Sequence, residues 1–169
     1  MASVDTMQDL VLIELRQAYG TERLVDEALP ELLDHVSSPG LMGDLQEMQA
    51  TSKRQQERLT QVFKHLDQEA KADNTGAAEA ILDQIKGIAK WKSEGMVRDA
   101  ALIAAAQQYA HYLIASYGNL RAHARALGHA QAEEIFGNCV EDEARIDEML
   151  TRRAESEVNV EAAGLVPTR

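Results

Sequence analysis

The sequence predicts an all-α protein in which four long helices form a bundle and a shorter helix lies between the second and third. Apolar residues recur at spacings of three and four along most of the chain, which is the period of an amphipathic helix. Alanine, the residue with the highest helix propensity, dominates residues 97–120. Only 4% of the residues are aromatic although 45% are hydrophobic, so aliphatic side chains must fill the core between packed helices.

The first helix is expected over residues 5–36, with Asp5 or Thr6 as its N-cap. The second is expected over about 41–70, and a shorter amphipathic helix over 77–92, capped by Thr75. The last long helix spans about 130–157. Residues 158–169 lack helical periodicity and are expected to form a mobile C-terminal tail, which leaves residues 1–157 as the single domain.

Residues 97–120 form the helix around which the chain is organised. Apolar side chains occur all round this helix, so we expect it to be buried on several sides. A membrane span is the other interpretation of such a stretch. Arg98, Asp99, two adjacent glutamines, His111 and three tyrosines make it unsuitable for contact with lipid.

The charge of the chain restricts its partners. With a net charge of −11 and a pI near 4.9, the surface as a whole repels nucleic acid and anionic membranes, and we expect neither as a partner. Cys139 is the single cysteine, which excludes an intramolecular disulfide and a paired-cysteine redox site. The N-terminal segment lacks the features of a secretory signal, so the expected location is cytoplasmic.

Polar residues interrupt the apolar stripes of three long helices. Glu22 does so on the first helix, Ser52 and Gln55 on the second, and Glu143 on the last, with Asp147 one turn beyond. A carboxylate in a helical core is costly unless it is paired, hydrogen-bonded, protonated or bound to a metal. The stripes therefore predict that these acids share an interior site.

The segments VRDAALIAAAQ and HYLIASYGNL of the central helix resemble the YciE/YciF-type family of bacterial ferritin-like proteins. Weaker similarity extends over residues 5–155 and includes AYGTERL around Glu22, QERL at 56–59 and EDEARIDEMLT at 141–151. The resemblance implies a ferritin-like four-helix bundle, with a di-iron carboxylate centre in many members. It also implies that Glu22 and Glu143 belong to the ligand layer of that centre.

The sequence departs from that pattern where further ligands are implied. Residues 50–55 read ATSKRQ and contain no carboxylate or imidazole, and the acids of the family's EHYE segment are replaced by Ala110 and Leu113. Glu22, Glu143 and Asp147 are then the remnant ligand positions of a degenerate site. We expect no bound cofactor, and we expect Lys53 to act as a substitute interior cation, with Arg54 as the second choice.

Three functions follow from this interpretation. The first is a non-catalytic structural or binding role in a stress-associated protein of this family. The second is a di-iron or di-manganese carboxylate protein with oxidoreductase or ferroxidase-like activity and an altered ligand set, so the sequence leaves open whether the protein is an enzyme. The third is binding of a small ligand or a partner helix in the emptied interior.

The short helix has an apolar stripe of its own, made of Ala77, Ile81, Ile85, Ile88 and Trp91. A four-helix core does not require this element, so the stripe predicts self-association, most simply as a two-fold homodimer. The alternative is that the short helix covers part of its own bundle.

Overall fold

The computed structural model of the chain describes residues 4–73, 75–93 and 95–165. All regular structure in these residues is helical. Five main helices follow one another as α1 (Met7–Leu33), α2 (Pro39–His65), α3 (Gly76–Ala89), α4 (Gly95–Ala126) and α5 (Ala130–Arg153). A π-helical turn, η1 (Ala154–Val158), and a short α6 (Asn159–Ala162) complete the chain. The predicted all-α bundle with a shorter helix between its second and third long helices is confirmed.

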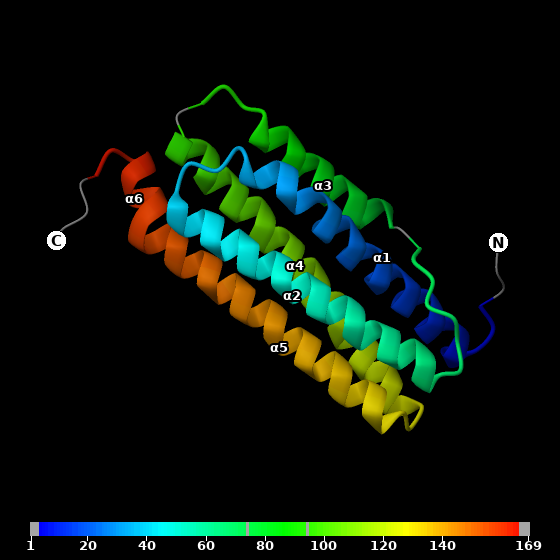
Figure 1. The fold of residues 1–169 in the computed structure, drawn as a ribbon. Helices are drawn as coiled ribbons and strands as arrows, with labels where there is room; N and C mark the ends of the chain where they lie inside the picture. Colours follow the sequence, from blue (N-terminus) through cyan, green and yellow to red (C-terminus); the bar gives the residue numbers. More distant parts are fainter. Residues whose placement is uncertain (1–3, 74, 94, 166–169) are drawn as a thin grey trace.

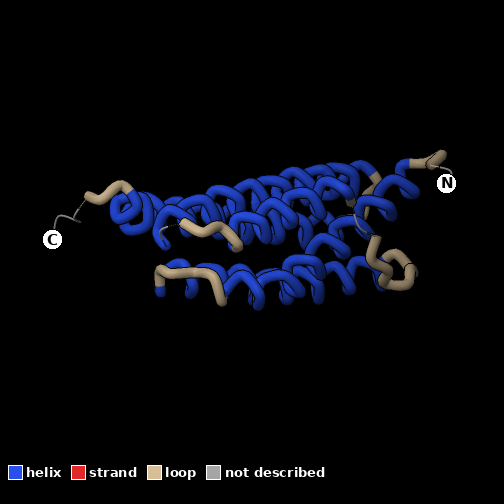
Figure 2. The backbone as a smooth tube through the Cα atoms, turned by 90° about the horizontal axis from the view of Figure 1, so that it is seen from above, coloured by secondary structure: helices blue, strands red, loops and turns tan. Residues whose placement is uncertain are grey.

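The four long helices pack side by side, and each contacts two neighbours in the order α1, α2, α5, α4 and back to α1. Figure 1 shows that α1 and α5 run in one direction and that α2 and α4 run in the other. Because α2 and α4 are parallel, the connection between them must return along the length of the bundle. The α3 helix makes this return on the outside of α1 and α4, as Figure 2 also shows.

Side-chain caps fix the starts of three helices. Thr6 caps α1 in a reciprocal arrangement in which the Asp9 amide donates to Thr6 Oγ1 at 3.1 Å and the Thr6 amide donates to Asp9 Oδ2 at 2.9 Å. Ser38 Oγ accepts from the Leu41 amide at 3.0 Å at the start of α2, and Thr75 Oγ1 caps α3. The caps predicted at Thr6 and Thr75 are therefore confirmed.

The α3 stripe packs against the protein's own core. Of the stripe, Ile85 and Ile88 are at most 5% exposed and Ile81 is partly buried, whereas Ala77 is exposed. Together with the neighbouring Leu82, the buried residues lie against α1 and α4. Trp91, which follows the helix, is 50% exposed. The stripe therefore covers part of its own bundle, which is the alternative interpretation of this helix. The surface through which the homodimer was predicted to form is largely occupied by α1 and α4 of the same chain.

A buried aspartate holds together the end of the bundle where α4 begins. Asp99 is 0% exposed and accepts hydrogen bonds from the backbone amides of Ser37 at 3.0 Å and Ser38 at 2.6 Å. Ser38 Oγ also donates to Glu157 in η1, and Glu157 pairs with Arg153. These contacts attach the turn between α1 and α2 to the start of α4 and to η1.

The chain stays packed beyond the expected end of the domain. Val158 is 0% exposed, and both η1 and α6 contact α4. The segment expected to be a tail therefore begins as packed helix up to Ala162, and the boundary after residue 157 is placed too early. Residues 166–169 lie outside the described residues.

Candidate functional site

Two glutamates from opposite corners of the bundle meet in its interior. Glu22 on α1 is 1% exposed, and Glu143 on α5 is 3% exposed. The charge of Glu22 raises the pKa of Glu143, and the charges of both glutamates raise the pKa of Tyr117, as expected for carboxyls in one interior layer. The prediction that these two acids share one interior layer agrees with this arrangement.

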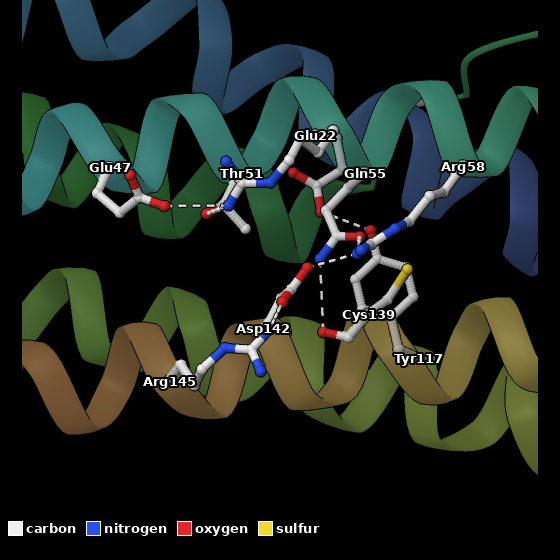
Figure 3. Close-up of polar contacts among 10 residues, drawn as sticks. Glu22, Glu47, Thr51, Gln55, Arg58, Tyr117, Cys139, Asp142 and Arg145 are labelled. Carbon is white, nitrogen blue, oxygen red and sulfur yellow. Dashed lines mark hydrogen bonds and ion pairs between the residues drawn. The ribbon is translucent and has the colours of Figure 1, made fainter.

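Glu22 is held by α4. The Tyr117 hydroxyl, 0% exposed, donates to Glu22 Oε1 at 2.5 Å, as Figure 3 shows. About two turns earlier on the same helix, the Tyr109 hydroxyl donates to the Thr21 carbonyl at 2.6 Å. From α2, Ser52 Oγ donates to the Glu22 backbone carbonyl at 2.7 Å. These hydrogen bonds link α1 to α4 and to α2, its two neighbours in the bundle. We call the buried residues Glu22, Ser52, Gln55, Tyr109, Tyr117 and Glu143 the polar layer.

Burial makes the charged forms of these acids unfavourable. It raises the pKa of Glu22 from 4.5 to about 7, although hydrogen bonds from Tyr117 and Ser52 partly oppose the shift. It also raises the pKa of Glu143, and the neighbouring Glu22 adds to that increase, while the Gln55 amide opposes it. At neutral pH the pair therefore retains a proton, which avoids two adjacent buried negative charges.

The other titratable groups of this layer are neutral near pH 7. Burial, followed by the charge of Glu22, raises the pKa values of Tyr109 and Tyr117 well above 10. The Cys139 thiol is 0% exposed, and burial raises its pKa to about 12. A thiol with that pKa is almost entirely protonated at neutral pH and is therefore a poor nucleophile.

A second polar cluster lies between this layer and the surface, on the side where α2 faces α5 (Figure 3). Its centre is Asp142, which is 5% exposed and accepts from both Arg58 and Arg145. The Arg58 guanidinium also donates to Gln55 Oε1 at 3.2 Å. Gln55, which is 0% exposed, in turn contacts the Cys139 backbone carbonyl and the Glu143 carboxyl. Gln55 therefore connects the buried glutamates to the Arg58–Asp142 ion pair.

The prediction that Lys53 is an interior cation is wrong. Its side chain is 59% exposed and pairs at 3.6 Å with Asp26, which is itself 29% exposed. Arg54, the second choice, is 47% exposed and pairs with Glu47 at 3.0 Å. The partly buried cation is instead Arg58, whose side chain is 30% exposed and whose partner is Asp142. Among the described residues, neither Glu22 nor Glu143 forms an ion pair.

Asp147 lies apart from the two glutamates. Its side chain is 24% exposed, and its Oδ1 accepts a hydrogen bond from Gln107 Nε2 on α4 at 3.0 Å. The same oxygen lies 3.4 Å from His111 Nε2. The structure thus brings together two of the three remnant positions, Glu22 and Glu143. The apolar stripes did not predict a role for Asp142 and Arg58, which flank them. The spacing of Asp142 and Arg145 by three residues in a helix was the available signal.

We expect Arg58→Met to lower the free energy of unfolding by about 2 kcal/mol. That value lies below the usual cost of breaking a buried ion pair, because Arg58 is partly exposed and Asp142 still pairs with Arg145 in the variant. Lys53→Met is the matched control, and we expect it to change stability by less than about 0.5 kcal/mol. Urea denaturation of both variants measures the difference. Equal effects would contradict the assignment of Arg58 as the cation of this cluster.

The donor set of the interior does not fit a dinuclear metal centre. Such centres in helical bundles use about six carboxylate and imidazole ligands from four helices. In the part of the chain that the structure describes, no group of three or more His, Cys, Asp or Glu side chains is placed to hold a metal ion. Thr51, Ala110 and Leu113, at positions where the family resemblance implies ligands, are all at most 2% exposed. The positions face the interior, but their side chains are not metal ligands.

An apolar cavity of about 20 Å³ lies between α1, α2, α3 and α4. Aliphatic side chains line it, among them Val25, Leu29, Met48 and Leu102. A space of this size holds about one water-sized particle, and apolar cavities commonly stay dry. It is too small for an organic ligand without movement of the surrounding helices.

The fold and the interior define a class of protein: an all-α bundle with a buried carboxyl pair and hydrogen-bonding neighbours in its middle layer. The chain belongs to the family described as a domain of unknown function, DUF892, which matches residues 6–163. It is 31% identical to protein YciF of Escherichia coli (strain K12) over 161 residues, which are 95% of this chain and 97% of that protein. The predicted family relationship is confirmed.

Solved structures of other proteins have the same fold. The crystal structure of the E. coli stress protein YciF matches with a TM-score of 0.88 over 92% of this chain and 99% of its own, at 31% identity. YcfI of Rhodopseudomonas palustris, for which a structural role has been suggested, matches with a TM-score of 0.85 at 33% identity, over 89% of this chain and 98% of that one. A protein from Xanthomonas campestris shares the fold with a TM-score of 0.73 at 14% identity, over 94% and 98% of the two chains.

None of the helices in the described part of the chain has a stretch long and apolar enough to cross a bilayer.

Proposed function

We propose that this protein is a stress-associated structural or binding member of its family, with a ferritin-like bundle whose di-iron site is degenerate. Protons and hydrogen bonds replace the metal in its middle layer. The observation that carries the proposal is the donor set, in which two buried glutamates face Gln55, Ser52 and two tyrosines rather than further carboxylates and histidines. The description of E. coli YciF as a stress protein supports the association with stress.

In this proposal the polar layer determines how the helices pack. Tyr117 connects α4 to α1 through Glu22, and Gln55 connects α2 to α5 through Glu143. Buried polar groups that are fully hydrogen-bonded restrict a core to one arrangement, because any other register leaves a donor or a carboxyl without a partner. The nearby cations, Arg58 and Arg145, pair with Asp142 rather than with the glutamates.

Metal analysis of the purified protein tests the proposal. After incubation with excess ferrous iron or manganese and then desalting, we expect well below one metal ion per chain by elemental analysis. About two tightly held ions per chain would contradict the proposal. That result would support the alternative, a di-iron or di-manganese oxidoreductase or ferroxidase-like protein with altered ligands.

A two-fold homodimer in the cytoplasm is part of this proposal. Because the α3 stripe packs within its own chain, such a dimer requires a different face of the bundle. Sedimentation velocity at micromolar concentration distinguishes a dimer from a monomer, and a monomer would exclude this part of the proposal.

A further inference from the structure

Two histidines that are far apart in the sequence meet at one end of the bundle. His65 is the last residue of α2, and His129 is the N-cap of α5. Their imidazole ring centroids lie 6.0 Å apart, and the ring planes are inclined at 88°. Figure 1 shows that the end of α2, the start of α5 and the start of α1 all lie at this end. The polar layer uses neither histidine.

The backbone of both histidines is fixed by the way their helices end and begin. Asp67, two residues after His65, has a φ of 53°, the left-handed conformation that terminates many helices. The His129 amide donates to the Ala124 carbonyl at 2.9 Å, and the His129 carbonyl accepts from the Glu133 amide at 2.9 Å. The two rings are therefore brought together by the fold, and only their side-chain torsions are free.

A hydrogen bond to α1 determines which nitrogen of His129 carries the proton. His129 Nε2 lies 3.1 Å from Gln8 Oε1. Because an amide oxygen only accepts, Nε2 is the donor, and the lone pair of the neutral ring is on Nδ1. In the described structure of α5, the His129 side chain makes no capping hydrogen bond. A ring whose one nitrogen donates to a fixed acceptor while the other keeps its lone pair is the usual form of a histidine that binds a metal.

The separation of the two rings suits a single metal ion. Two imidazoles on one ion, with metal–nitrogen bonds of about 2 Å, have ring centres about 5–6 Å apart. The rings are nearly perpendicular, so one of them must turn before both nitrogens point at the same ion. The outer torsion of histidine is broad, and His65 is exposed, so this turn costs little. The carbonyl end of α2 attracts a cation and offsets the repulsion at the start of α5.

We propose that His65 and His129 bind one divalent ion of a late first-row transition metal, such as nickel or zinc, with water completing its coordination. Imidazole suits these metals, whereas manganese and ferrous iron bind weakly to nitrogen ligands. The ion links the end of α2 to the start of α5, and Gln8 positions the His129 ring. This site lies outside the polar layer and takes a different class of metal, so it does not rest on the proposed function.

Calorimetric titration of the full-length protein with nickel, after treatment with EDTA and desalting, tests the proposal. We expect one nickel ion per chain and much weaker binding of manganese. His65→Gln and His129→Gln should each weaken nickel binding at least about tenfold, because removing even a hydrogen-bonding neighbour of a histidine ligand commonly costs about 10–100-fold. Gln8→Leu should also weaken binding, and Gln8→Glu should preserve it, because a carboxylate accepts from Nε2 as well.

His35→Gln is the matched control. His35 precedes the start of α2, so the length of that helix separates it from His65, and nickel binding should be unchanged. In NMR spectra of the natural protein, paramagnetic nickel should broaden the imidazole signals of His65 and His129 before that of His35. This readout does not depend on the folding of any variant.

Three results would overturn the proposal. If nickel does not bind to the natural protein, the two histidines form an edge-to-face ring contact only. If nickel binds equally to the natural protein and to His65→Gln, the ion is held elsewhere. Broadening of the His35 signal first would have the same meaning. All of these variants keep Glu22 and Glu143, so the iron and manganese analysis of the interior remains a separate test.

Discussion

Replacing Thr51, Ala110 and Leu113 together by glutamate is expected to unfold the metal-free protein at neutral pH. All three positions are at most 2% exposed, and the interior of the bundle already contains Glu22 and Glu143. An unpaired carboxylate in a core costs several kcal/mol or must take up a proton, and each added acid also repels the others. Three such changes together are comparable to the whole stability of a typical domain, about 5–15 kcal/mol.

The same three changes are expected to make folding depend on metal. With five interior carboxyls, the layer approaches the ligand number of a dinuclear centre, and a divalent cation removes the repulsion among them. Thermal denaturation with and without manganese measures this: a ligand at a hundred times its Kd stabilises by about 2.7 kcal/mol. The variant with glutamine at the three positions is the control, since it has nearly the same volume but no charge to bind a cation.

The outcome distinguishes two accounts of the interior. If the glutamate variant regains a cooperative transition in manganese and the glutamine variant does not, the three positions are the missing part of a metal site. If neither variant responds to manganese, these positions are not placed as ligands, and the interpretation of the interior as a degenerate metal centre would have to be abandoned.

The helical period explains why the sequence predicted the glutamates but misplaced the cation. Glu22 and Glu143 stand in register with buried apolar neighbours on their own helices, so the stripe alone places them inside. On α2 the buried positions include Met48, Thr51, Ser52, Gln55 and Leu59. Position 53 is turned by about 100° from position 52 and therefore faces solvent. The prediction for Lys53 relied on its place in an aligned segment rather than on its angle around the helix.

Contacts between helices could not be predicted in this way. Arg58 meets Asp142 because α2 and α5 pack in a particular register, and no pattern within either helix specifies that register. Asp99 is a different case, because α4 is apolar nearly all round. A helix without one apolar face gives no angle from which to decide that Asp99 points inward, toward the amides of Ser37 and Ser38.

The stability of the protein is expected to fall as the pH rises from about 4.5 to about 7. The Glu22 carboxyl has a pKa of about 7 in the folded state and 4.5 as an ordinary glutamate, so between these values the folded protein binds more protons than the unfolded chain. The stabilisation is complete below pH 4.5 and is lost as the pH passes 7. A difference of this size corresponds to about 3 kcal/mol. The raised pKa of Glu143 acts in the same direction.

Glu22→Gln is the variant that isolates this effect. Its amide is uncharged at every pH and nearly the same size as the carboxyl, so the decline in stability between pH 4.5 and 7 should become clearly shallower. Glu157 provides a built-in contrast, since the hydrogen bond from Ser38 and the nearby Arg153 lower its pKa, and its stabilisation is lost only as the pH falls below about 4.5. Urea denaturation at pH 5 and pH 7.5 measures both proteins. An equally steep decline in Glu22→Gln would mean that Glu22 does not hold a proton in the buried pair near neutral pH.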